Sequence, residues 1–255
     1  MVKLLVSDFD RTLYVGSCIS RRTLLAVRTW MEQGNLFAVA TGRDEESIRC
    51  KLGNYGLEAD YLICNNGARI AAWKGDLLFH DEIDIRTVRE IVADLERRYD
   101  TTLALTIGKH RIQVGKCGDT VLYPELEICV RPEDCAKIQG GVLQIHKRFE
   151  DRTRAAGAAD MLMKSYPDVS AMANEWNLDI VRNGVDKAQA IIYLLSETAL
   201  ETDVVVIGDS LNDVGMIRRF KGYTLEHAGE EVRLQAAHVC RDVAACIEQE
   251  TEYGI

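Results

Sequence analysis

Four aspartates, in two short groups far apart in the chain, could together hold a metal ion. Asp8 and Asp10 come at the end of one apolar run, and Asp209 and Asp213 follow another. Carboxylates that lie close together raise each other's pKa and destabilise the fold unless a cation neutralises them. A set of oxygen ligands favours Mg²⁺ over zinc or copper. The four aspartates therefore predict a magnesium site.

A lysine and a threonine could hold a phosphate group beside such a metal. Lys187 would bring a positive charge to the site, and Thr41 ends a third apolar run, where a helix start offers backbone N–H groups to phosphate oxygens. A metal ion, a lysine, a hydroxyl and a free carboxylate suit phosphoryl transfer, in which the enzyme mainly positions groups and neutralises charge. A carboxylate can also act as the nucleophile and form an aspartyl-phosphate.

The elements that must position these residues alternate between strands and helices. Short apolar runs typical of buried parallel strands lie at residues 3–7, 36–40, 61–64 and 204–207. Their alternation with helical patterns predicts an α/β fold with a doubly wound, mostly parallel, Rossmann-like sheet. Ligands of such sheets bind at the carboxyl ends of the strands, so the four aspartates, Thr41 and Asn66 would share one site.

The pattern changes in the middle of the chain, where a helix followed by two strands occurs twice. The first helix and strand pair lie at 85–99, 103–107 and 111–114, a further strand at 142–145, and the second helix and strand pair at 153–165, 169–172 and 178–181. This order predicts an α+β insert with an antiparallel sheet. We expect a core domain built from residues 1–80 and 184–255 and an inserted cap domain at residues 81–183 that roofs the site.

At these residues the chain resembles the haloacid dehalogenase (HAD) phosphohydrolase superfamily. Its four motifs occur here in the family's order: Asp8-Phe9-Asp10-Arg11-Thr12, Thr41, Lys187 and Gly208-Asp209-Ser210-Leu211-Asn212-Asp213. Three further features resemble the Cof-type branch with a type-two-B cap: Thr41-Gly42-Arg43, the Asn66-Gly67-Ala68 turn and the long insert after the second motif. The resemblance spans the whole core, whereas the cap matches in its coarse pattern only.

The resemblance implies a role for each aspartate. Asp8 would be the nucleophile, and Asp10 would protonate the leaving oxygen and then activate water. Asp8, Asp209 and the backbone carbonyl of Asp10 would bind Mg²⁺. Asp213 would support the metal's ligands or orient Lys187.

The resemblance also implies residues that bind the phosphoryl group or the rest of the substrate. They are Thr41, Gly42, Arg43, Asn66, Lys187 and Asn212. Thr41 and Lys187 would hold the phosphoryl oxygens, and Arg43 and Asn66 would face the substrate beneath the cap.

The chain departs from the family pattern at three places near the site. Arg11 stands where the family usually has glycine, Ala188 follows Lys187 where glycine is common, and Glu226-His227-Ala228 replaces the usual Asn-Ala. If the backbone at Arg11 needs a positive φ, an arginine costs about 1 kcal/mol there. None of the departures removes a reacting group, so they bear on the substrate more than on the chemistry.

Composition excludes several classes of protein. The chain has 255 residues, 47% hydrophobic and 28% charged, as ordinary globular proteins do. A net charge of −9 without a basic stripe argues against nucleic acid, and no apolar run approaches the ~20 residues of a membrane helix. The eight cysteines include no C-x-x-C pair and the first residues do not form a secretory signal, so we expect reduced thiols and a cytoplasmic protein.

We therefore expect a Mg²⁺-dependent phosphomonoester hydrolase for a small phosphorylated metabolite, such as a sugar phosphate, acting as a monomer or homodimer. A phosphomutase would instead pass the phosphoryl group to a second sugar hydroxyl. A non-catalytic phospholigand sensor is the alternative from another class, although the presence of Asp8, Asp10, Lys187 and Asp209 argues against it. A dinucleotide binder would need a G-x-G-x-x-G sequence after the first strand, and the chain has none.

Overall fold

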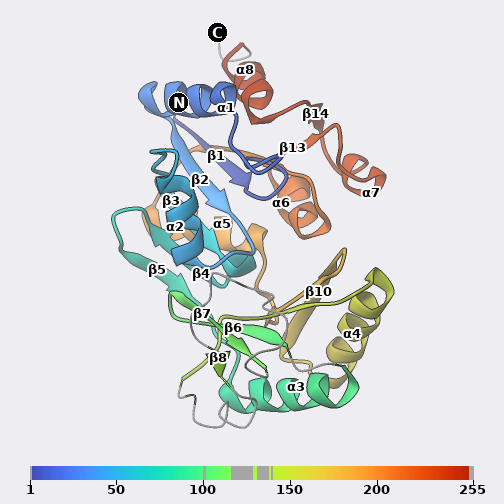
Figure 1. Cartoon of the computed structure of the whole chain (residues 1–255). Coiled ribbons are helices and arrows are strands. Elements are labelled where there is room, and N and C mark those ends of the chain that lie inside the picture. The colour runs from blue at the N-terminus through green and yellow to red at the C-terminus, as the bar shows by residue number, and fades with distance from the viewer. Residues whose placement is uncertain (1, 100–101, 116–128, 131–137, 139, 253–255) are drawn as a thin grey trace. The chain divides into compact units, whose positions relative to one another are not determined.

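A computed structural model describes residues 2–99, 102–115, 129–130, 138 and 140–252 of the chain (Figure 1). The chain forms two compact units. Unit 1 comprises Met1–Arg43, Ser47–Phe79 and Asp186–Ile255, and unit 2 comprises Asp44–Glu46 and His80–Val185. In the described part of the chain, no helix is long and apolar enough to cross a membrane.

Unit 1 is built on an eight-stranded sheet. Its strands are β1 (Lys3–Asp8), β2 (Leu36–Ala40), β3 (Tyr61–Cys64), β4 (Arg69–Ala72), β5 (Leu77–His80), β12 (Asp203–Gly208), β13 (Lys221–Leu225) and β14 (His238–Cys240). Their order is β14-β13-β12-β1-β2-β3-β4-β5. Neighbouring strands are parallel from β14 to β3, and β4 is antiparallel to β3. The predicted α/β fold with a mostly parallel sheet is confirmed.

Helices cover both faces of this sheet. They are α1 (Arg21–Glu32), α2 (Glu45–Gly53), α5 (Lys187–Thr198), α6 (Val214–Arg219), α7 (Glu230–Arg233) and α8 (Val243–Glu252). Leu5 of β1 packs in the apolar cluster formed with α1, α2 and α8, whereas Leu4 and Val6 pack in the cluster formed with α5, α6 and α7. A strand that is buried on both faces does not alternate between polar and apolar residues, which explains the continuous apolar runs in the sequence.

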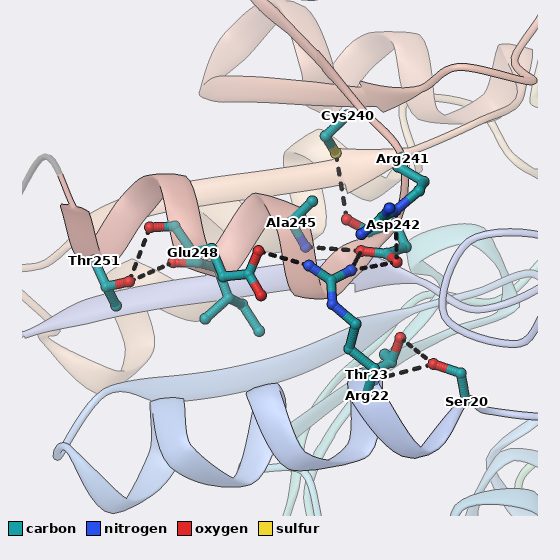
Figure 2. Close-up of polar contacts among 10 residues, drawn as sticks. Ser20, Arg22, Thr23, Cys240, Arg241, Asp242, Ala245, Glu248 and Thr251 are labelled. Carbon is teal, nitrogen blue, oxygen red and sulfur yellow. Dashed lines mark hydrogen bonds and ion pairs between the residues drawn. The ribbon is translucent and has the colours of Figure 1, made fainter.

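Helix α1 is fixed on both of its sides. On its inner side Trp30 is buried, and its indole N–H donates a hydrogen bond to the backbone carbonyl of Leu36 at 2.8 Å. On its outer side Arg22 donates to Asp242, the residue before α8, at 2.5 Å and to Glu248 of α8 at 2.6 Å (Figure 2). These contacts connect the first helix of the chain to the last one.

Three strands of the sheet that the apolar runs in the sequence do not predict are very short. β4 and β5 are four residues long and β14 is three, and β5 is nowhere fully buried. Segments of three or four residues are too short to show a periodic pattern, although β4 is largely buried. The strand predictions therefore omit these three elements, which extend the sheet at its two sides.

Unit 2 contains a six-stranded sheet with the order β10-β11-β9-β6-β7-β8. Its elements are α3 (Ile85–Arg98), β6 (Leu103–Ile107), β7 (His110–Val114), β8 (Cys129–Val130), β9 (Gln144–Arg148), α4 (Arg152–Ser165), β10 (Val169–Asn174) and β11 (Asn177–Arg182). Both predicted strand pairs form antiparallel hairpins. The strand predicted at 142–145 begins at Gln144, because Val142 instead pairs with Ile83 in an isolated bridge.

One face of the second sheet packs on two helices. Val88, Ile91 and Leu95 of α3 and Ala158 and Leu162 of α4 join apolar residues of β6, β7, β9, β10 and β11 in one buried cluster. Unit 2 therefore has a core of its own.

Gly67, in the turn after β3, lies against the start of α5. Its φ is +108°, and a Cβ atom there would come within 2.4 Å of the backbone carbonyl oxygen of Asp186. We expect Gly67→Ala to lower the free energy of unfolding by about 2–4 kcal/mol, because it combines left-handed strain with a backbone clash. Gly34→Ala is the control, since Gly34 has a φ of +84° but nothing within 4 Å, and it should cost only about 1–2 kcal/mol. Urea unfolding measures both, and equal losses would contradict the close approach.

Candidate active site

The predicted site residues of unit 1 lie at one edge of its sheet. Asp8 ends β1, Thr41 follows β2, Asn66 follows β3 and Asp209 follows β12. β1 pairs in parallel with both β2 and β12, and β2 pairs with β3. The carboxyl ends of four adjacent strands therefore bring together residues that are far apart in the sequence.

Three carboxylates cluster at this edge. Asp8, Asp209 and Asp213 are buried, and each offers an oxygen atom within 4.8 Å of the others. Asp213 ends a short 3-10 helix, and its Oδ2 atom accepts hydrogen bonds from the backbone N–H groups of Asp209, at 3.1 Å, and Ser210, at 3.0 Å. The loop after β12 thus fixes the direction of the Asp213 carboxylate.

Lys187 supplies a positive charge to two of these carboxylates. It is the first residue of α5, its side chain is fully buried, and its Nζ atom donates to Oδ1 of Asp8 at 2.7 Å and to Oδ1 of Asp213 at 2.6 Å. The helix start is held by Asp186, whose carboxylate accepts a hydrogen bond from the backbone N–H of Gln189. Capping of α5 therefore also positions the ammonium group.

One ammonium group does not balance three buried carboxylates. Burial raises the pKa of Asp8 to about 8, and Asp213 and Asp209 add to this rise while Lys187 opposes it. Burial, followed by the charge of Asp213, also raises the pKa of Asp209. Burial lowers the pKa of the Lys187 ammonium, but the charges of Asp213 and Asp8 outweigh burial and raise it above its usual value.

The carboxylate cluster has the properties of a site for a divalent cation. Oδ1 of Asp209 accepts hydrogen bonds from the hydroxyls of Thr12, at 3.3 Å, and Ser210, at 3.1 Å. Its Oδ2 atom is buried and accepts no hydrogen bond from any described residue. An all-oxygen donor set with surplus negative charge fits Mg²⁺.

Asp10 lies beside the cluster and makes its own ion pair. Arg43 donates from its ε nitrogen to Oδ2 of Asp10 and from a terminal nitrogen to Oδ1, both at 2.8 Å. The Arg43 guanidinium also lies 5.5 Å from the centre of the Phe9 ring. The Asp10 side chain is 47% exposed and is not among the three clustered carboxylates.

The predicted phosphate-binding residues lie in the loops around these groups. Asn212 donates from its side-chain amide to the side-chain oxygen of Asn66 at 3.0 Å, and the backbone N–H of Asn66 donates to the carbonyl of Thr41. The Thr41 hydroxyl accepts from the backbone N–H of Arg43, and Gly42 lies in the bend between them. The amide oxygen of Asn212 is buried and has no hydrogen-bond donor among the described residues.

Two residues at the cluster have no assigned role in the sequence motifs. The Arg11 Nε atom lies 3.3 Å from Oδ2 of Asp209, and the His227 Nε2 atom lies 3.8 Å from the same oxygen. Arg11 has a φ of +66°, so the expected cost of a side chain at this position applies. The sequence signal for Arg11 was its place in a motif that usually has glycine there, while nothing in the sequence pointed from His227 to Asp209.

Removing Lys187 should expose the repulsion among the carboxylates. We expect Lys187→Met to lower the free energy of unfolding of the metal-free protein by about 3–5 kcal/mol at pH 8. The loss should be smaller at pH 5. A carboxyl whose pKa is raised in the folded state keeps its contribution at low pH and loses it as pH rises through the folded pKa. Urea unfolding in chelator, at both pH values, measures this difference.

The double variant Lys187→Met/Asp8→Asn is the matched control for that experiment. It removes one of the repelling carboxylates, so part of the stability lost at pH 8 should return. A loss of the same size at pH 5 and pH 8 that Asp8→Asn does not relieve would contradict the electrostatic explanation.

Comparison with known proteins gives matches over nearly the whole chain. The family model of haloacid dehalogenase-like hydrolases matches residues 5–245. A protein of Haemophilus influenzae with the name "Putative phosphatase" is 25% identical over 252 residues, which cover 92% of this chain and 88% of that protein.

Solved structures share the fold. A HAD subclass IIB sugar phosphatase superposes with a TM-score of 0.81 at 17% identity over 99% of each chain. A "putative HAD/COF-like hydrolase" from Plasmodium vivax superposes with a TM-score of 0.86 at 19% identity, over 99% of this chain and 96% of the other. The resemblance predicted from the four motifs is confirmed, and the chain belongs to the haloacid dehalogenase-like hydrolase family.

Proposed function

We propose that the chain is a Mg²⁺-dependent phosphomonoester hydrolase that works through an aspartyl-phosphate on Asp8. The observation that carries this proposal is the buried cluster in which Lys187 contacts Asp8 and Asp213 while Asp209 completes a set of three carboxylates. The name of the Haemophilus influenzae relative, a phosphatase, supports the same reaction.

In the first step a carboxylate oxygen of Asp8 attacks the phosphorus atom of the substrate. The bond between phosphorus and the leaving oxygen breaks, and Asp10 gives its proton to that oxygen. Lys187 fixes Oδ1 of Asp8 and neutralises charge at the attacking carboxylate. Arg43 contacts both carboxyl oxygens of Asp10, as it would an ionised carboxylate, so it must release one oxygen before Asp10 can carry and donate the proton.

In the second step a water molecule attacks the phosphorus atom of the aspartyl-phosphate. Asp10, now ionised, takes a proton from the water, so that it ends the cycle protonated as it began it. The bond between phosphorus and the Asp8 oxygen breaks, which releases inorganic phosphate and restores the Asp8 carboxylate. No group other than substrate and water is consumed.

Asp8, Asp209, Asp213 and the backbone carbonyl of Asp10 would hold Mg²⁺. When bound, the ion would neutralise the surplus charge of the carboxylates and of the phosphoryl oxygens. Oδ2 of Asp209, which accepts no hydrogen bond from a described residue, supports this assignment.

The substrate we propose is a small sugar phosphate. The solved HAD subclass IIB relative is a sugar phosphatase, and this supports the assignment by analogy of fold. Thr41, Gly42 and Lys187 would bind the phosphoryl group, and Asn66, Asn212 and Arg43 would line the rest of the substrate site. We further propose that residues 1–80 and 184–255 form the catalytic core and that residues 81–183 form a cap.

Phosphate release from a panel of sugar phosphates and one aryl phosphate tests the proposed activity. Release should need Mg²⁺ and stop with chelator, and Asp8→Asn should reduce it to background with the thermal unfolding temperature of the metal-free protein unchanged or raised. Asp203→Asn is the matched control, because Asp203 is exposed at the opposite end of β12 and should leave the rate unchanged.

Other outcomes of the phosphate-release assay would indicate a different function or a different nucleophile. Isomeric sugar phosphates with little free phosphate would indicate a phosphomutase. Tight binding of a sugar phosphate without turnover would indicate a non-catalytic sensor. Full activity of Asp8→Asn would contradict the nucleophile assignment.

Asp10→Asn should affect the two steps, phosphoryl transfer to Asp8 and hydrolysis of the aspartyl-phosphate, to different extents that depend on the leaving group of the substrate. For a sugar phosphate, whose leaving oxygen must be protonated, we expect kcat to fall by about 10²–10⁴-fold. An aryl phosphate has a good leaving group, so release of the aryl alcohol in a first turnover should fall much less than later turnovers. Rapid-quench measurement of the aryl alcohol checks this. Equal losses in the first and later turnovers would contradict the two roles of Asp10.

A further inference from the structure

Arg11 places the positive charge of its guanidinium against one carboxylate of the buried cluster formed by Asp8, Asp209 and Asp213. Its Nε atom lies 3.3 Å from Oδ2 of Asp209, the buried oxygen that accepts no hydrogen bond from any described residue. The same oxygen that would bind a metal ion therefore already faces a cation.

The backbone brings the Arg11 side chain to this position at a cost. Arg11 adopts a φ of +66°, a conformation that glycine takes without strain, and its N–H donates to the carbonyl oxygen of Tyr14 at 2.9 Å. The turn therefore has a fixed shape that does not need a side chain. The arginine side chain at this point adds a positive charge next to Asp209.

Burial differs sharply between the two partners. The Asp209 side chain has no exposed surface, whereas the Arg11 side chain is 52% exposed. The guanidinium thus lies on the solvent side of the cluster, at the end of a long flexible side chain. It can leave Asp209 without uncovering the core, whereas Lys187, which is fully buried, cannot.

We infer that Arg11 competes with the divalent metal ion for Asp209 and weakens metal binding by this chain. The inference rests on the metal site of the proposed function. In the metal-free protein Arg11 offsets part of the cluster's surplus negative charge. When an ion binds Asp209, the guanidinium and the ion repel each other, so Arg11 must move toward solvent.

Isothermal titration of Mg²⁺ into the full chain tests this competition without any substrate. Arg11→Gln removes the charge and keeps a side chain with the same backbone strain, so Mg²⁺ should bind about ten-fold more tightly than in the unchanged protein. Arg11→Lys keeps the charge under the same strain, and its Kd should stay within about three-fold of the unchanged protein. In chelator, Arg11→Gln should also unfold at a lower temperature than Arg11→Lys.

Two results would overturn the competition while leaving the proposed function in place. One is an equal or weaker Mg²⁺ affinity in Arg11→Gln. The other is an affinity gain in Arg11→Lys as large as that in Arg11→Gln, which would trace the effect to shape instead of charge. If neither the unchanged protein nor Arg11→Gln binds Mg²⁺, the metal site fails, and both the proposed function and this inference fail with it.

Discussion

The contact between the buried Lys187 ammonium and the carboxylates of Asp8 and Asp213 is the interaction on which the site depends. It joins the first strand of the chain to the helix that begins with Lys187 and to the loop after β12, and removing the lysine would leave uncompensated negative charge in the core. Several local features serve this contact. Asp186 caps the helix that begins with Lys187, the glycine after β3 lets that helix start approach, and two backbone N–H groups orient Asp213.

The surplus negative charge of the carboxylates is the second constraint on the site. Two arginines on its more exposed side partly neutralise this charge. Arg43 pairs with Asp10 and Arg11 faces Asp209, so each carboxylate that lies away from Lys187 still has a cation beside it. The loops that carry these groups also hold strained residues. Arg11, Asn65 and Asn66 have positive φ values and lie in the loops that follow β1 and β3. Strain of this kind persists where the surrounding contacts fix the backbone, and it gathers at functional sites.

The sequence predicted the parts of the fold that bury continuous apolar surface. The apolar runs of β1, β2, β3 and β12 predict these strands because helices cover both of their faces, whereas β4, β5 and β14 have only three or four residues each and are too short to show a pattern. The positions of Asp8, Thr41 and Asp209 follow from the rule that parallel strands end at one edge. The sequence does not predict which side chains contact each other, because spacing along a chain does not determine the direction of a side chain. The contacts it could not predict include Arg43 with Asp10, Asn212 with Asn66 and Arg11 with Asp209. The roles of these residues stay predictions.

The most direct test of the account is to find the phosphoryl group on the enzyme. Asp10→Asn, mixed with an aryl phosphate and Mg²⁺ and quenched in acid within one turnover, should accumulate the aspartyl-phosphate, because the first step needs no proton and the second lacks its base. Peptide mass spectrometry should then detect one added phosphoryl group on the peptide that contains Asp8, and none in the Asp8→Asn/Asp10→Asn double variant. Release of the aryl alcohol with no phosphorylated peptide, or with the phosphoryl group on another residue, would contradict the assignment of Asp8 as the nucleophile.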